Sequence, residues 1–256
     1  MTPTLLCAVR NCHLPLERDE QSYVCDRNHS FDIARSGYIN LLQPQDRRSR
    51  VPGDRDEAVE ARHRLTDRGI FAPLLNALRP LVPSTDSILD AGCGDGYYLG
   101  SLVKSGGCGV DISTAAIDLA ARRYPEAQWV VANADRFIPY ADASFDVVIS
   151  ITGRLNRSEF RRVIRNEGLL LVGVSAPDDL VELRGAARDR VSRTIAMFSP
   201  DFELIEKQRA TTTADLDGES VRDLLTATYR PREAAAASRV TLSLDLLRFR
   251  VSGSAK

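Results

Sequence analysis

The stretch Ile88-Leu-Asp-Ala-Gly-Cys-Gly-Asp-Gly-Tyr-Tyr98 decides how the rest of the sequence is interpreted. A short apolar run ends in Asp90, and three alternate glycines separate it from a helical pattern that begins at Tyr97. Glycine adopts positive φ and lets a ligand lie against bare backbone, while the free amides of a helix N-terminus face that ligand. The stretch therefore predicts a buried strand, a tight ligand-binding turn and a helix.

The spacing of these glycines separates the candidate ligands. A dinucleotide-binding turn has the pattern G-x-G-x-x-G, and a phosphate-binding loop ends in Lys followed by Ser or Thr. This chain has G-x-G-x-G and no such lysine. The pattern resembles the first motif of class I methyltransferases, which implies that the loop holds the methionine part of S-adenosylmethionine. The cofactor-binding residues implied at this motif are Asp90, Gly92, Gly94, Gly96 and Tyr97. A plain strand-to-helix turn, with Tyr97 and Tyr98 packed on the helix, remains the alternative for this motif alone.

Two further strand ends carry matching polar residues. Cys108-Gly-Val-Asp111 ends in a carboxylate about 20 residues after the loop, in register with the acidic residue that accepts ribose hydroxyls. Ile112 follows it. Val131-Ala-Asn133-Ala-Asp135 resembles the adenine-side motif, which implies contacts from the backbone of Ala134 and from the side chain of Asn133 or Asp135. The run from 139 to 149 resembles the lead into a fourth strand, so four motifs occur in the expected order.

The hydrophobic pattern around these motifs alternates between strands and helices. Short apolar runs predict strands at 87–91, 107–111, 128–132, 145–151, 169–174, 202–209 and 240–250, the last two with the alternation of antiparallel edge strands. Helical patterns occupy 97–104, 114–123, 157–165, 178–194 and 219–226. Such alternation predicts an α/β fold with helices on both faces of a mainly parallel sheet. The expected fold is a Rossmann-like, seven-stranded class I methyltransferase sheet plus a small N-terminal β module.

Cysteine and histidine are concentrated at the N-terminus. Cys7-x4-Cys12 and Cys25-x3-His29 offer three thiolates and an imidazole in two paired groups, which suits a closed tetrahedral zinc site. His13 competes with His29 for the fourth position, and unliganded buried cysteines are the other alternative. We expect a zinc-binding module at residues 1–42, a linker and helical connector at 43–83, and a methyltransferase domain at 84–256.

Charge and composition indicate an ordinary globular protein. The 256 residues contain 34 basic and 35 acidic side chains, a balance that does not favour nucleic acid. No apolar run reaches the roughly 18 residues of a membrane-spanning helix, and the first residues do not resemble a signal peptide. We therefore expect a cytoplasmic protein. Two local clusters are basic, one running from Arg154 to Arg165 and one in the linker at Arg47, Arg48 and Arg50; each is equally well interpreted as a solvated surface.

Together these features resemble the family of ribosomal large-subunit RNA guanine-N1-methyltransferases, which includes macrolide-resistance enzymes. The most specific matching stretches are His29-Ser-Phe-Asp-Ile-Ala-Arg-Ser-Gly-Tyr-Ile-Asn-Leu-Leu42 and Arg48-Ser-Arg-Val-Pro-Gly-Asp54, followed by Ala61-Arg62 and Gly69. The resemblance implies that the zinc domain helps to bind a 23S rRNA hairpin and that the protein forms a homodimer. Phosphate contacts would come from Arg47, Arg48, Arg50, Arg154, Arg157 and Arg161.

Three stretches depart from that family's pattern. Relatives have two residues between the first two cysteines instead of four, a Tyr-Ala-Pro-like stretch where this chain has Thr152-Gly153-Arg154, and a Thr-Pro-aromatic stretch where it has Ala227-Thr-Tyr229. The cofactor motifs are thus intact, whereas the acceptor motifs differ. Thr152, Arg154 and Tyr229 are the residues expected to form the wall of the acceptor pocket.

The reaction expected from the sequence is methyl transfer from S-adenosylmethionine to guanine N1 in a 23S rRNA hairpin, either as a housekeeping modification or for antibiotic resistance. Guanine N1 carries a proton at neutral pH, so a base must accept it, and the sequence does not identify that base. A small-molecule methyltransferase on the same scaffold is the first alternative, favoured by the near-zero net charge. A non-catalytic, zinc-dependent RNA-binding protein is the second.

Overall fold

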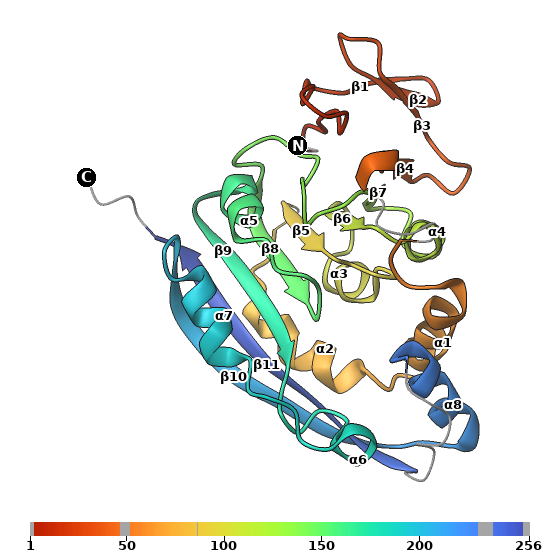
Figure 1. The fold of residues 1–256 in the computed structure, drawn as a ribbon, viewed down its shortest axis with the longest axis vertical. Helices are drawn as coiled ribbons and strands as arrows, with labels where there is room; N and C mark the ends of the chain where they lie inside the picture. The colour runs from red at the N-terminus through yellow and green to blue at the C-terminus, as the bar shows by residue number, and fades with distance from the viewer. Residues whose placement is uncertain (1–2, 47–51, 86, 230–237, 253–256) are drawn as a thin grey trace.

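The computed structural model describes residues 3–46, 52–85, 87–229 and 238–252. Two sheets organise them: a small antiparallel sheet near the N-terminus and a large mixed sheet of eight strands. In Figure 1 the small sheet stands above the edge of the large sheet at which β4 and β7 lie. The small sheet contains β1 (Glu17–Asp19), β2 (Ser22–Val24) and β3 (Ser30–Asp32).

The large sheet has the strand order β10-β11-β9-β8-β5-β6-β7-β4. Its parallel part comprises β4 (Ile39–Asn40), β5 (Ile88–Ala91), β6 (Cys108–Asp111), β7 (Gln128–Val131), β8 (Phe145–Ile151) and β9 (Ile164–Ser175). The antiparallel part comprises β10 (Phe202–Asp215) and β11 (Arg239–Val251). All seven expected strands are present, which confirms the predicted architecture, and β4 adds a short eighth strand from the N-terminal module.

The two faces of the sheet have separate apolar cores, because successive strand residues point to opposite faces. One core includes residues of α1 (Asp56–Asp67), α2 (Ala72–Leu78), α3 (Tyr97–Leu102), α4 (Thr114–Arg123) and α8 (Gly218–Ala227). The other includes residues of α5 (Arg157–Val163) and α7 (Val191–Phe198). The remaining short helices are η1 (Pro44–Asp46), η2 (Arg79–Leu81) and α6 (Val181–Arg184). None of the helices in the described residues is long and apolar enough to cross a membrane.

The N-terminal module packs against the segment between β7 and β8. Residues 132–144 contain no helix or strand, and the adjoining core includes Leu5, Leu16 and Phe31 from the module. Leu5 forms an isolated antiparallel bridge with Tyr140, and Leu6 N donates to the Pro139 carbonyl at 3.0 Å. The module is therefore attached by backbone hydrogen bonds as well as by apolar contacts.

Two elements differ from the pattern predicted by the sequence. The single helix expected at 178–194 is wrong: α6 ends after Arg184 because Gly185 adopts φ 68°, and α7 begins only at Val191. The helix expected at 157–165 ends at Val163, and β9 begins at Ile164, five residues before the expected start at 169. As a result, basic residues that the sequence pattern placed on these two helices lie outside them in the structure.

Candidate active site and metal centre

The glycine loop lies at the carboxyl end of β5, in the middle of the parallel strands. Gly92, Gly94 and Gly96 all have positive φ (81°, 55° and 76°), as the sequence predicts for this turn. The three glycines differ in their surroundings: Gly92 and Gly94 line open cavities, whereas a Cβ on Gly96 would lie 2.5 Å from the ring of Trp129. Gly96 therefore permits close packing between α3 and β7, a role that differs from the expected ligand contact.

A cavity of about 480 Å³ opens beside the loop. Asp111 lies in it with an anchored carboxylate: Gly94 N donates to Oδ2 at 3.0 Å and Ser113 N donates to Oδ1 at 2.8 Å. Burial raises the pKa of Asp111 despite these two hydrogen bonds. The cavity brings together the cofactor residues expected from three motifs: Gly92, Gly94, Asp111, Ile112, Asn133, Ala134 and Asp135. An anchored carboxylate in such a cavity is suited to accepting a diol.

The adenine-side motif is tied to the linker by side-chain contacts. Asn133 Nδ2 donates to the Asp46 carbonyl at 3.1 Å, and Asp135 N donates to Asn133 Oδ1 at 3.1 Å. Arg136 also forms an ion pair with Asp46. The Asn133 side chain therefore shapes the turn, and Ala134 and Asp135 line the cavity.

A second cavity, of about 340 Å³, adjoins the first across the loop and is lined by both Tyr97 and Tyr98. Asp90 and Asp95 line it too, and the Oδ2 atom of each is buried without a hydrogen-bond partner among the described residues. Burial, together with the charges of Asp111 and Asp95, raises the pKa of Asp90 to about 8. Buried acidic oxygens without partners favour a cationic ligand, and S-adenosylmethionine offers both an ammonium and a sulfonium group. The residues present thus fit that cofactor.

The turn after β8 connects both cavities to a third. Thr152 lines all three, and this third cavity is an open groove of about 1030 Å³ that also contains Arg154 and Asn156. Thr152 has φ 56°, a backbone conformation that is costly for a β-branched residue. Such strain is typical of functional turns, and Thr152 is a residue that the three cavities share.

The groove also contains three arginines that the sequence analysis missed. Arg188, Arg190 and Arg193 are exposed, lie on the segment around the start of α7, and form no ion pair among the described residues. They are separated from the Arg154–Arg165 cluster in the sequence and lie within the stretch expected to be one helix. The helical periodicity of the sequence did not reveal the break at Gly185.

The other expected acceptor residues are partly engaged. Arg154 is highly exposed and pairs with Asp135 at 3.4 Å. Tyr229 is exposed; its hydroxyl donates to Asp54 Oδ1 at 3.1 Å and accepts from Arg55 N at 3.1 Å. Tyr229 therefore holds the linker in place as well as lining the second cavity.

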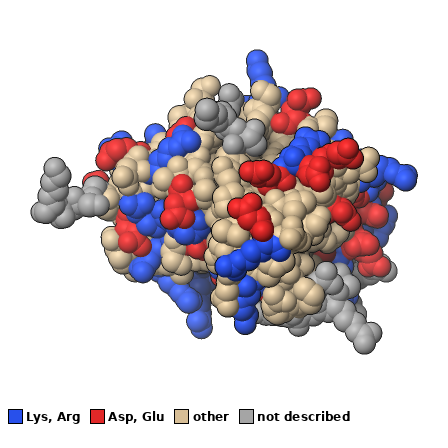
Figure 2. Space-filling view, turned by 90° about the horizontal axis from the view of Figure 1, so that it is seen from above, with Lys and Arg blue, Asp and Glu red and all other residues tan. Residues whose placement is uncertain are grey.

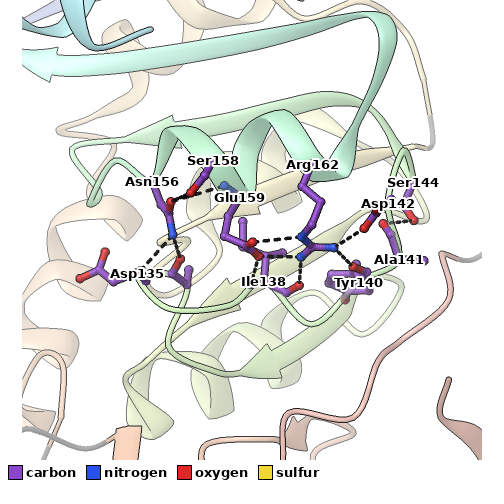
Figure 3. Close-up of polar contacts among 11 residues, drawn as sticks. Asp135, Ile138, Tyr140, Ala141, Asp142, Ser144, Asn156, Ser158, Glu159 and Arg162 are labelled. Carbon is purple, nitrogen blue, oxygen red and sulfur yellow. Dashed lines mark hydrogen bonds and ion pairs between the residues drawn. The ribbon is translucent and has the colours of Figure 1, made fainter. Parts of the chain in front are cut away.

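The expected phosphate-binding arginines of α5 have partners within the fold. Arg157 pairs with Asp201 at 3.0 Å, and Arg161 donates to Asn166 at 3.2 Å. Arg162 is built into the fold: it donates to the carbonyls of Ile138 and Tyr140 and pairs with Glu159 (Figure 3). Figure 2 shows acidic and basic side chains interspersed over the uppermost face of Figure 1. Arg47, Arg48 and Arg50 lie outside the described residues.

The cysteine cluster has the geometry of a metal centre. The ligand atoms of Cys7, Cys12, Cys25 and His29 all lie within 4.8 Å of one another. Nδ1 of His29 is 3.4 Å from the sulfurs of both Cys7 and Cys25, and the sulfurs of Cys12 and Cys25 are 3.8 Å apart. Tetrahedral zinc with ordinary bond lengths requires about 3.8 Å between sulfurs and about 3.5 Å between sulfur and nitrogen. These four residues fit zinc closely.

His13, the alternative fourth ligand, has a different position. Its ring stacks on Phe137, with centroids 4.2 Å apart and an interplanar angle of 9°. Phe137 belongs to the loop between Asn133 and β8, so His13 helps to attach the metal module to the adenine-side loop. His13 is not one of the four residues whose ligand atoms form the cluster.

Comparisons with known proteins agree with these sites. A family model described as "RlmA, N-terminal", a zinc ribbon, matches residues 6–50, and a methyltransferase-domain model matches residues 88–168. The 23S rRNA (guanine(748)-N(1))-methyltransferase of Streptomyces fradiae is 31% identical over 227 residues, covering 82% of this chain and 80% of that protein. A Micromonospora griseorubida protein provisionally named for 23S rRNA guanine-N1 methylation is 34% identical over 211 residues, covering 72% and 69%.

Solved structures show the same fold at low identity. A methyltransferase of Thermotoga maritima superposes with a TM-score of 0.53 at 17% identity, covering 77% of this chain and 98% of that chain. A chain from the Haloferax volcanii complex of the Trm112 methyltransferase activator gives 0.52 at 21% identity, covering 78% and 98%. These similarities support the class I methyltransferase fold.

Proposed function

Because the chain belongs to the family of 23S rRNA guanine-N1-methyltransferases and is an S-adenosylmethionine-dependent enzyme, we propose that it methylates N1 of a guanine in a 23S rRNA hairpin. The observation that carries this proposal is the meeting of three cavities at Thr152. Two of them surround the glycine loop, and the third is a groove open to a large substrate.

In this proposal the adenosine part of the cofactor occupies the 480 Å³ cavity. Asp111 accepts the ribose hydroxyls, and Ile112, Asn133, Ala134 and Asp135 surround the adenine. The methionine part extends past Gly92 and Gly94 toward Asp90 and Tyr97. When bound, the cofactor supplies an activated methyl group, so the protein contributes positioning and removal of water.

The acceptor would enter through the groove. A guanine within a hairpin must leave its stack to reach an enzyme's reactive centre. Arg188, Arg190 and Arg193, with Arg154, provide positive charge for the flanking phosphates. Arg47, Arg48 and Arg50 are proposed as additional phosphate contacts, and Arg157 and Arg161 as weaker ones because they already have partners.

The zinc ribbon holds its ion through Cys7, Cys12, Cys25 and His29 in this proposal. All four positions of a tetrahedral zinc are then filled, so the site is structural, with no position open for water. Its role is to keep the module attached beside the adenine-side loop. Since the proposed substrate is ribosomal RNA, we place the protein in the cytoplasm.

A transfer assay tests this proposal. The protein is incubated with methyl-labelled S-adenosylmethionine and 23S rRNA that lacks the modification. We expect label in the RNA, located at guanine N1 by mass spectrometry of digested nucleosides. Asp111→Asn should lower cofactor affinity at least about tenfold, as for the loss of hydrogen bonds to a charged group, whereas Asp118→Asn, which changes a carboxylate on α4 away from the cavities, should retain activity.

Two outcomes would contradict the proposal. Tight cofactor binding without label in the RNA would favour a small-molecule acceptor on the same scaffold. Label at another atom would exclude guanine N1. If label is found, macrolide susceptibility of cells with and without the protein distinguishes a resistance role from a housekeeping role.

A further inference from the structure

Arg62 occupies a position at the glycine loop that none of the motifs explains. It lies on α1 and lines both the 480 Å³ and the 340 Å³ cavity. Its Nη1 atom is 3.7 Å from the place that a Cβ on Gly94 would take. Among the described residues that line the 340 Å³ cavity, Arg62 is the only lysine or arginine. A single guanidinium thus lies over the middle of the loop.

The partners of Arg62 leave most of its donors available. Its one ion pair among the described residues is with Asp54, at 3.5 Å, and both side chains are more than a third exposed (38% and 35%). An exposed ion pair of that length contributes little stability. A guanidinium has five N–H donors in a planar fork that matches a carboxylate. Arg62 can therefore bind a second carboxylate without losing Asp54.

The cofactor supplies such a carboxylate at this place. Its amino-acid end carries an ammonium group and a carboxylate, and the ammonium is suited to the unpartnered Oδ2 of buried Asp90. A carboxylate placed near Asp95 and Asp111 would be repelled unless a cation stood beside it. Arg154, the other arginine of the 480 Å³ cavity, is paired with Asp135 on the adenine side.

We propose that Arg62 binds the α-carboxylate of S-adenosylmethionine and that Asp54 is its positioning residue. Asp54 is itself fixed: its Oδ1 accepts from the Tyr229 hydroxyl, and its carbonyl accepts from Ser113 Oγ at 3.1 Å. The residue Tyr229 after α8 and the residue Ser113 after β6 therefore both hold Asp54, which in turn pairs with the Arg62 guanidinium. This inference depends on the cofactor and not on the identity of the acceptor.

The test compares two ligands that differ only in the carboxylate. Dissociation constants for S-adenosylmethionine and for its decarboxylated form, which keeps the sulfonium and the amine, are measured by calorimetry on the full-length protein. For the wild type we expect the decarboxylated ligand to bind ten- to a hundredfold more weakly, the range for a charge-assisted hydrogen bond. In Arg62→Gln the two affinities should become nearly equal, because only S-adenosylmethionine loses affinity.

Further variants separate binding from folding. Arg62→Lys keeps the charge but not the fork, so it should retain part of the preference. Asp54→Asn should reduce the preference severalfold, and Arg122→Gln, which loses an exposed pair with Asp118 on α4, should leave it unchanged. An unchanged preference in Arg62→Gln, or equal weakening of both ligands, would overturn the proposal. Neither outcome depends on RNA methylation, so failure here is distinguishable from failure in the transfer assay.

Discussion

Asp90 is one buried carboxyl group through which the stability of the fold depends on pH. In the unfolded chain an aspartate ionises near pH 4, whereas burial and the charges of Asp111 and Asp95 raise the pKa of Asp90 to about 8 in the fold. Between these values the unfolded state loses a proton that the folded state retains. The stability contributed by this group is therefore fully present below about pH 4 and is lost as the pH rises toward 8.

Asp90→Asn should remove this loss of stability at higher pH. Without cofactor, we expect the free energy of unfolding of the variant, relative to the wild type, to increase by at least ~1 kcal/mol between pH 5 and pH 8, because one pKa unit corresponds to ~1.4 kcal/mol. Urea denaturation at the two pH values measures this difference. A difference that stays constant with pH would show that Asp90 titrates normally in the fold.

Alanine variants at Gly96 and Gly69 distinguish two losses of stability, one from steric clash and one from the left-handed backbone conformation. Their φ angles are similar (76° and 73°), but a Cβ on Gly96 meets Trp129 at 2.5 Å and one on Gly69 meets nothing within 4 Å. Gly69→Ala should cost about 1 kcal/mol for the left-handed conformation alone. Gly96→Ala should cost ~2 kcal/mol more because α3 and β7 must separate. Equal losses in thermal or urea unfolding would contradict this interpretation.

At the scale of elements, α5 illustrates how a basic helix can be structural. Arg162 is half-buried and donates to two carbonyls of the loop that precedes β8, and Glu159 accepts from Ile138 N at 2.7 Å (Figure 3). Among the described residues, the adjacent Arg161 donates only to exposed Asn166. The helix therefore holds the loop between the adenine-side turn and β8, and only part of its charge is free.

Arg162→Gln and Arg161→Gln test that distinction with neighbouring residues. Loss of Arg162 removes the ion-pair partner of Glu159 and one donor to each of the Ile138 and Tyr140 carbonyls, so unfolding should become easier by ~2–3 kcal/mol. Arg161→Gln should change stability by less than ~0.5 kcal/mol, as is usual for surface residues whose contacts are with solvent-exposed groups. Chemical denaturation gives both values. A stable Arg162→Gln variant with weak RNA binding would instead make this arginine a phosphate contact, the role expected for Arg161.

Sequence alone could predict the elements whose signals are local. The turn of Gly92, Gly94 and Gly96, the strands that end at Asp111 and Val131, and the metal cluster all follow from short patterns. Properties that depend on distant partners could not be predicted. Asp201 neutralises Arg157 from 44 positions away, and the groove arginines follow a break at Gly185 that helical periodicity conceals. Arg62 belongs to the stretch Ala61-Arg62 that matches the family pattern, but the match assigned it no role, because a single arginine on an amphipathic helix is usually a solvated one.

At the scale of the whole molecule, the zinc module and the cofactor cavity share one loop. Leu5 and Leu6 pair with its end at Pro139 and Tyr140, His13 stacks on Phe137, and Asn133 at its start contacts Asp46. The module therefore supports the adenine side of the cavity from outside. This coupling could not be predicted from the sequence, since it depends on the pairing of β4 with β7.

Removal of the metal should consequently affect both sites. We expect one zinc per chain by elemental analysis. After chelation, the segment before β4 should become sensitive to protease, because a site of this kind contributes its binding energy to folding. Affinity for S-adenosylmethionine should fall severalfold, since the adenine-side loop loses its support, and added zinc should restore both properties. Unchanged cofactor affinity in the metal-free protein would show that the loop is stable by itself.

Because β4 pairs with β7, the N-terminal segment cannot join the large sheet until the ribosome has synthesised β7. Ile39 pairs with Val130, which the ribosome adds about ninety residues later. At roughly 5–20 residues per second, the N-terminal segment waits for several seconds without its partner strand. During that time the segment lacks the large sheet against which it packs. Its fold then depends on its own residues, including the cysteines and the histidine of the metal cluster. Supply of zinc to the nascent chain should therefore influence the yield of folded protein more than zinc added after synthesis.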